Sequence, residues 1–161
     1  MKNFGFYILI ALGVLGYNYV TEADRDGQGV IVSGGSVDAF NMRIGDCFDD
    51  TSSTFGDEAT EIGSLPGVPC ASPHDNEVFA VFDVGISSFP SDEEISNLAF
   101  DSCMERFENF VGRDYESSDL DIKTLYPTKD SWNTLNDREV VCAIYDMNES
   151  KLVGSVEGRG L

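Results

Sequence analysis

The chain has 161 residues, of which 42% are hydrophobic, which is enough for one hydrophobic core but not for two. Its 29 Asp and Glu residues against 10 Lys and Arg residues give a formal net charge of −19. Nucleic acids bind clustered basic side chains, and these ten form no cluster, so the composition argues against DNA or RNA binding. An anionic lipid surface would also repel the domain.

The chain begins with an uncharged stretch, residues 3–21, which follows Lys2 and precedes Glu22. As a helix it would span roughly 28 Å, close to the hydrocarbon thickness of a bilayer. The positive-inside rule then places the N-terminus in the cytoplasm and the rest of the chain outside. We therefore expect residues 1–21 to be a single-pass anchor in the cell membrane. A cleaved signal peptide is the alternative, and it exports the domain as well.

Residues 22–36 contain Asp-Gly and Gly-Gly pairs, so we expect a juxtamembrane tether with only a short strand at residues 30–32. The extracytoplasmic domain is then expected over residues 37–161. In residues 37–44, apolar and polar side chains alternate, with Phe40, Met42 and Ile44 on the same face, which predicts a half-buried strand. The polar, acidic residues 51–64 predict a surface loop.

The next segment, residues 68–79, holds the only histidine and two of the five prolines. Each proline fixes its own φ and favours an extended residue before it, so we expect a stiff loop. We expect a disulfide at Cys70 to hold this loop and the loop to present His74 and Asp75 at the surface. Residues 77–84 follow with apolar side chains on both faces, which predicts a central strand.

A helix is predicted over residues 92–111. Ser91 and Glu94 fit a capping box, and Gly112 fits the C-terminal stop. Apolar residues recur at three- and four-residue spacing between these two signals, and Cys103 lies among them.

The remaining chain predicts a strand over residues 120–126, a short helical turn around Trp132, and a strand over residues 138–146. Residues 151–156 are expected to pair with this last strand as a hairpin. The expected fold class is therefore α+β, with a small antiparallel sheet of four to six strands covered by one main helix, two disulfides and a preceding transmembrane helix.

The four cysteines are widely and irregularly spaced, with no C-x-x-C pair, which favours two disulfides in an oxidising compartment over a zinc ribbon. Four cysteines allow three connectivities. We favour Cys47–Cys70, because both flank the same acidic loop, and Cys103–Cys142, because the helix should cover the strand that carries Cys142. Reduced thiols in a cytosolic protein are the alternative, and the uncharged N-terminal stretch argues against it.

Several of these segments resemble the bacterial septum formation domain family, whose members are membrane-anchored proteins or lipoproteins with an extracytoplasmic domain. The resemblance covers roughly residues 40–158 and implies a role at the division septum or cell envelope, but no established chemistry. The segments that carry it are Gly45-Asp46-Cys47-Phe48, Val68-Pro69-Cys70-Ala71-Ser72-Pro73-His74-Asp75-Asn76-Glu77-Val78, Cys103, Tyr126-Pro127-Thr128-x-x-Ser131-Trp132 and Asp137-Arg138-x-Val140-Val141-Cys142.

Pro73, His74, Asp75 and Glu77 form the candidate functional loop. A hydrolase needs a nucleophile, a base and an orienting acid together, and neighbours in sequence do not supply that arrangement. We therefore expect His74 or Asp75 to cap the loop through side-chain-to-backbone hydrogen bonds, with no catalytic residue.

A loose metal site is a weaker alternative, in which Asp46, Asp49 and Asp50 would lie near His74 and Asp75. We expect neither a metal nor a cofactor.

The expected function is a non-enzymatic, membrane-anchored envelope module that binds an envelope protein or a wall component. One alternative is an extracytoplasmic hydrolase or metal-dependent enzyme that uses His74 and Asp75. The other is a small accessory subunit of a membrane complex, with the anchor helix as its interface.

Overall fold

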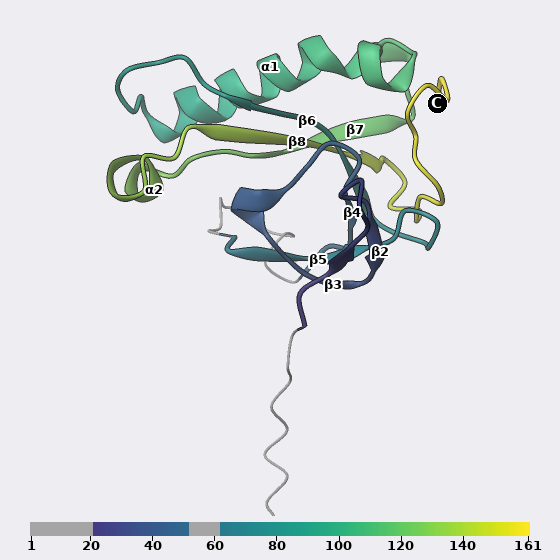
Figure 1. Ribbon diagram of the computed structural model, residues 1–161. Helices are drawn as coiled ribbons and strands as arrows, with labels where there is room; N and C mark the ends of the chain where they lie inside the picture. Colours follow the sequence, from purple (N-terminus) through teal and green to yellow (C-terminus); the bar gives the residue numbers. More distant parts are fainter. Residues whose placement is uncertain (1–20, 52–61) are drawn as a thin grey trace, which may run out of the picture.

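The structure is a computed structural model that describes residues 21–51 and 62–161 (Figure 1). Nearly all of the predicted anchor and most of the predicted loop at 51–64 lie outside these residues. The elements are β1 (Asp24–Arg25), β2 (Ile31–Ser33), β3 (Gly35–Asp38), η1 (Ala39–Asn41), β4 (Cys47–Phe48), β5 (Ser64–Val68), β6 (Asn76–Asp83), α1 (Asp92–Val111), η2 (Tyr115–Ser117), β7 (Leu120–Leu125), α2 (Lys129–Thr134) and β8 (Glu139–Asp146).

The main sheet has six antiparallel strands in the order β3-β5-β4-β6-β8-β7, and β1 and β2 form a separate two-stranded sheet. The predicted α+β class with an antiparallel sheet and one main helix is therefore confirmed. No helix among the described residues is both long enough and apolar enough to cross a membrane.

Helix α1 forms where its end signals predict it. The Ser91 hydroxyl accepts a hydrogen bond from the Glu94 amide, and the Glu94 carboxylate accepts one from the Ser91 amide. At the other end Gly112 has a φ of 82°, the left-handed conformation in which glycine carries no steric cost. The buried face of α1, which includes Cys103 and Phe107, packs on β6, β7 and β8.

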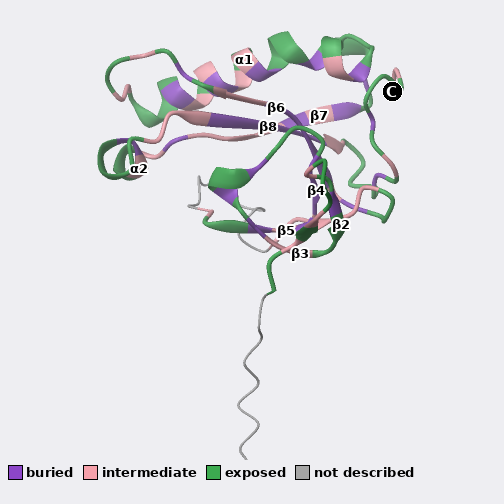
Figure 2. Ribbon diagram, viewed as in Figure 1, coloured by how far each residue is buried: buried purple, intermediate pink, exposed green. Residues whose placement is uncertain are grey.

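Strand β6 is buried on both faces, as predicted for a central strand, and its neighbour β8 is buried on both faces as well (Figure 2). One face, including Cys142 and Ile144, contributes to the core beneath α1. The other face, including Val78 and Val141, packs with Phe48 and Leu65 in a second core. The strands β3 and β5 lie on the side of this second core that is remote from α1 (Figure 1).

Both predicted disulfides are confirmed. Cys47–Cys70 joins β4 to the loop before β6, and Cys103–Cys142 joins α1 to β8. They close loops of 23 and 39 residues, for which loop-closure entropy gives about 3–4 kcal/mol of stabilisation each.

The predicted strand over residues 37–44 is wrong beyond Asp38. The Asp38 carboxylate accepts a hydrogen bond from the Phe40 amide and starts the single turn of η1. The alternation of exposed and buried faces is therefore lost. Met42 is buried, whereas Phe40 and Ile44 are 47% and 59% exposed.

Residues 22–36, predicted as a tether, are folded in the structure. They contain β1, β2 and the start of β3, and the Ile31 side chain lies in the second core. Arg25 also forms an ion pair with Asp46, which is 21 residues further along the chain.

The predicted C-terminal hairpin is also wrong. Residues 151–156 form no strand with β8. Instead Leu152 forms an isolated antiparallel bridge with His74. The backbone of this segment bonds to the loop before β6, so it is not available to β8.

Candidate functional site

The candidate site is centred on the loop that connects β5 to β6, residues 69–75, which we call the histidine loop. Its start is fixed by the disulfide from Cys70 to Cys47 and by a turn in which the Ser72 amide donates to the Pro69 carbonyl over 2.8 Å. The proline at position 73 then extends the chain toward β6, which begins at Asn76.

His74 is fully buried, so the prediction that it lies at the surface is wrong. Its Nδ1 lies 2.8 Å from the Ser72 carbonyl oxygen, an acceptor, and therefore Nδ1 carries the proton and donates. The His74 amide donates to the Leu152 carbonyl over 3.0 Å, and the Leu152 amide donates back over 2.8 Å. The side-chain-to-backbone bond is the contact expected for a loop-capping residue.

Glu77 is fully buried at the start of β6. One carboxylate oxygen accepts from the Ser155 hydroxyl over 2.5 Å, and the other accepts from the Val156 amide over 2.7 Å. The Cys70 carbonyl accepts from the Gly154 amide over 2.7 Å. The histidine loop and Glu77 therefore hold the C-terminal segment, residues 151–156, by its backbone.

Beyond this segment, residues 158–160 cap the C-terminus of α1 through hydrogen bonds to its last carbonyl groups. The Gly158 amide donates to the Phe110 carbonyl over 2.7 Å, and the Gly160 amide donates to the Val111 carbonyl over 2.8 Å. The last carbonyls of a helix have no partner within it, so these two bonds satisfy groups that would otherwise need water. The contacts of the histidine loop are thus linked to the main helix.

Asp75 is half-buried and forms an ion pair with Lys151. Its carboxylate accepts from Lys151 Nζ over 2.8 Å and from the Asp50 amide over 2.9 Å. Burial alone would raise the pKa of Asp75, but the bonds from Lys151 and Asp50 outweigh it and hold that pKa below its ordinary value. Lys151 also bonds to Asp49 over 2.8 Å, and these two carboxylates raise the lysine pKa.

A second lysine bonds to Asp50, the residue whose amide donates to Asp75. Lys123 on β7 donates to Asp50 Oδ1 over 2.5 Å, and the side-chain Nδ2 of Asn76 donates to the same oxygen over 3.0 Å. The aspartates that the sequence suggested as loose metal ligands therefore lie near the histidine loop, but Asp49 and Asp50 each bond to a lysine ammonium group. No local pattern in the chain indicated that these two lysines would meet the aspartates.

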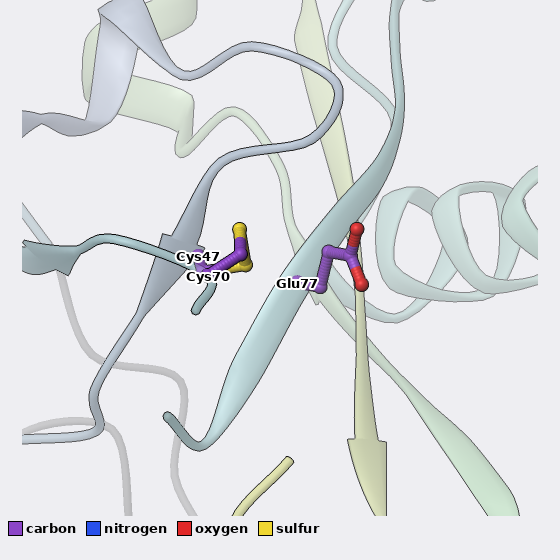
Figure 3. A group of neighbouring side chains, drawn as sticks. All are labelled: Cys47, Cys70 and Glu77. Carbon is purple, nitrogen blue, oxygen red and sulfur yellow. A yellow bond between two sulfur atoms is a disulfide. The ribbon is translucent and has the colours of Figure 1, made fainter. Parts of the chain in front are cut away.

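One group of possible metal ligands does occur among the described residues, formed by Cys47, Cys70 and Glu77, whose ligand atoms lie within 4.8 Å of one another. The two sulfur atoms are joined as a disulfide and supply no thiolate. Figure 3 shows the Glu77 carboxylate pointing away from them, and both of its oxygens accept hydrogen bonds from the C-terminal segment. In the oxidised protein these residues do not fit a metal ion.

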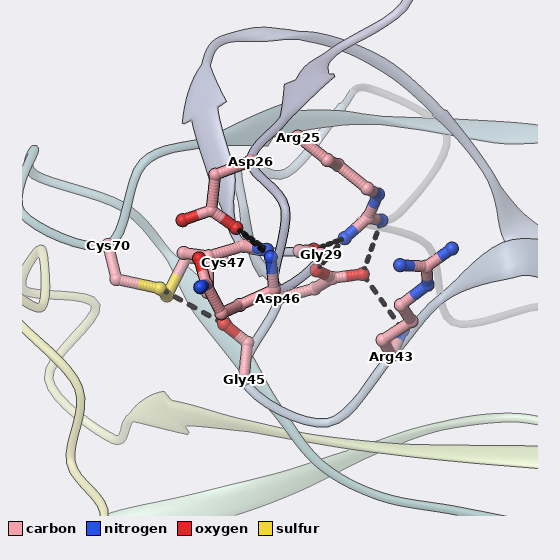
Figure 4. A network of polar contacts seen from close by, with 10 residues as sticks. Arg25, Asp26, Gly29, Arg43, Gly45, Asp46, Cys47 and Cys70 are labelled. Atoms are coloured by element: carbon pink, nitrogen blue, oxygen red, sulfur yellow. Dashed lines mark hydrogen bonds and ion pairs between the residues drawn. A yellow bond between two sulfur atoms is a disulfide. The ribbon is translucent and has the colours of Figure 1, made fainter.

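The segment before Cys47 has its own polar network (Figure 4). Asp46 is buried, and its two oxygens accept from the two terminal nitrogens of Arg25 over 2.5 and 2.7 Å. The Arg43 amide donates to the same carboxylate over 2.8 Å. Sequence reasoning missed Arg25, although a single arginine between two aspartates in an acidic segment was a possible signal.

Asp121 on β7 accepts hydrogen bonds from two tyrosine hydroxyls, from Tyr115 over 2.6 Å and from Tyr145 over 2.9 Å. Burial, followed by the Asp121 carboxylate, raises the pKa of each tyrosine to about 12. Asp121 also accepts from the Ile122 amide over 2.7 Å, which uses a backbone donor on this edge strand. No sequence motif indicated this cluster.

A family model described as septum formation matches residues 35–159. The chain belongs to the septum formation family. No curated protein and no solved structure matches it. The family signature can now be placed in the structure, and its residues serve internal contacts. Its aspartate at position 46 binds Arg25, and its Trp132 ring lies under the Arg138 guanidinium, 3.5 Å from the ring centroid.

Proposed function

We propose that this septum formation protein is a non-enzymatic, membrane-anchored module of the cell envelope that acts by binding another component. The burial of His74 carries this proposal. A general base must reach the proton that it removes, and this imidazole is fully buried and bonded to the Ser72 carbonyl. A structural role accounts for the hydrogen bonds that His74 and Glu77 form.

The proposed location rests on the sequence and on the cysteines. The uncharged residues 3–21 have the length and composition of a single membrane span. All four cysteines are in disulfides, which persist in oxidising compartments outside the cytoplasm. Both features support an N-terminus in the cytoplasm and the domain outside.

The proposed partner is an envelope protein or a wall component that contacts side chains on the domain surface. Strand addition at the β3 edge of the main sheet is a poor alternative, because residues 21–23 already bond to β3. At the opposite edge, the Ile122 amide of β7 donates to Asp121. The net charge of −19 would steer a cationic partner toward the domain.

The test is affinity capture of the full chain from native membranes after mild detergent extraction, with a chain lacking residues 37–161 as the control. We expect one or more envelope components to be enriched by the full chain alone. Enrichment of the same proteins by both chains, or of none, would contradict binding through the domain. Recovery in a single stoichiometric complex would instead support an accessory subunit.

His74→Ala separates the structural role from chemistry. It removes a buried hydrogen-bonded side chain, so we expect a loss of about 2–4 kcal/mol in the free energy of unfolding. Below its melting temperature the variant should still capture the same partner. A variant of unchanged stability that has lost its cellular function would favour the hydrolase or metal-dependent enzyme that uses His74 and Asp75.

A further inference from the structure

The first described residues, 21–23, are hydrogen-bonded to the domain. The Ser36 amide donates to the Thr21 carbonyl over 2.8 Å, and the Ala23 amide donates to the Ser36 carbonyl over 3.0 Å. Gly35 shows how closely the two segments pack, because a Cβ added there would lie 2.5 Å from the Thr21 carbonyl oxygen. Residues 21–23 therefore lie directly against β3.

Further contacts secure the residues that follow. Ala23 packs against the second core, and Arg25 forms its two hydrogen bonds with the buried carboxylate of Asp46. A flexible tether of 15 residues would let the domain move roughly 20 Å from the membrane. The folded segment 22–36 removes that freedom, so the uncharged stretch 3–21 ends where the rigid domain begins.

We propose that the outer face of β3 and β5 rests on phospholipid headgroups and that α1 faces away from the membrane. This inference rests on the membrane anchor of the proposed function. Figure 1 shows the first described residues leaving the domain beside β3, on the side opposite α1. A chain that enters the bilayer from that side, without a tether, brings this face closest to the lipid.

The side chains on this face permit close approach to headgroups. Ser36 pairs with Pro66 and Asp38 with Ser64 across the two strands, and these four residues alternate with the buried Val37 and Leu65. Only Asp38 among the four is charged, and Glu22, which forms a bridge with Ser36 at the edge of β3, adds one more exposed carboxylate.

The surface of α1 is much more acidic. It exposes a single basic residue, Arg106, and six acidic residues, Asp92, Glu93, Glu94, Asp101, Glu105 and Glu108. Headgroup phosphates repel carboxylates, so the charge distribution favours the same orientation as the chain path.

The orientation is tested with the full chain in nanodiscs of phosphatidylcholine that contain a paramagnetic headgroup lipid. Backbone amide signals at Ser36 and Asp38 should show paramagnetic relaxation more than about tenfold stronger than those at Asp101 and Glu105. The ratio is large because the domain is roughly 30 Å across and the effect falls with the sixth power of distance. A water-soluble paramagnetic agent, measured separately, corrects for differences in exposure.

The matched control is a chain with a flexible spacer of about 20 Gly and Ser residues before Thr21, which adds roughly 25 Å of reach. The spacer leaves the contacts of Thr21 in place, and it should reduce the relaxation at Ser36 at least severalfold. Equal relaxation at β3 and α1 in the original chain, or stronger relaxation at α1, would overturn the orientation but leave the anchor intact. Failure of the chain to enter the nanodiscs would overturn the anchor, and the orientation with it.

Discussion

Replacing Glu77 tests whether the family signature holds the C-terminal segment. Glu77→Ala removes the acceptor for the Ser155 hydroxyl and for the buried Val156 amide. Hydrogen bonds to a charged group contribute about 1.5–3 kcal/mol each, so the expected loss is about 3–6 kcal/mol. Since domains of this kind unfold with about 5–15 kcal/mol, the variant should be severely destabilised.

Glu77→Gln provides the matched control. The glutamine carbonyl can accept from the Val156 amide, and its NH₂ group can donate to the Ser155 hydroxyl oxygen, which also accepts. Only the charge assistance is lost, so the expected cost is about 1–2 kcal/mol. The alanine variant should therefore lose at least twice as much stability as the glutamine variant.

The assay is equilibrium unfolding in urea with the disulfides intact, followed by the fluorescence of Trp132, which is the only tryptophan and is buried. Hydrogen exchange of the amides at Gly158 and Gly160, which cap α1, should also be faster in Glu77→Ala. A loss below about 1 kcal/mol in Glu77→Ala would refute the reasoning. It would mean that the buried carboxylate does not hold the C-terminal segment.

Two further predictions follow from burial. A soluble dithiol should reduce Cys47–Cys70 before Cys103–Cys142 in the folded protein, because Cys70 is partly exposed and both cysteines of the second pair are fully buried. Alkylation followed by mass spectrometry would identify the free thiols. Simultaneous reduction of the two disulfides would contradict the prediction. In the folded protein the pKa of Tyr115 and of Tyr145 is about 12, above the ordinary value of 10.0. The contribution of these two hydroxyls to the free energy of unfolding is therefore complete below pH 10 and falls as the pH rises toward 12. Asp121→Asn should move tyrosinate absorbance to lower pH, and identical titrations of both proteins would show that Asp121 does not control these hydroxyls.

The sequence alone determined the elements whose signals are local. Helix α1 has its cap residues within one turn of its start and its glycine just past its end, and its apolar stripe repeats at helical spacing. The central position of β6 was predictable because its apolar residues lie on both faces, and β8 was predictable as a strand from its own apolar residues. The pairing of Cys103 with Cys142 followed once that helix was placed on that sheet.

Only the tertiary structure decided the role of the family signature. His74 is fully buried, and its backbone bonds to Leu152, which lies 78 positions further along the chain. No local pattern encodes that contact. The folding of residues 22–36 depends in the same way on Arg25 reaching Asp46. Periodicity and end signals specify which residues form a helix or strand. Which segments then share a hydrogen bond or an ion pair depends on how the whole chain packs, because distant backbone and charged groups compete for the same partners.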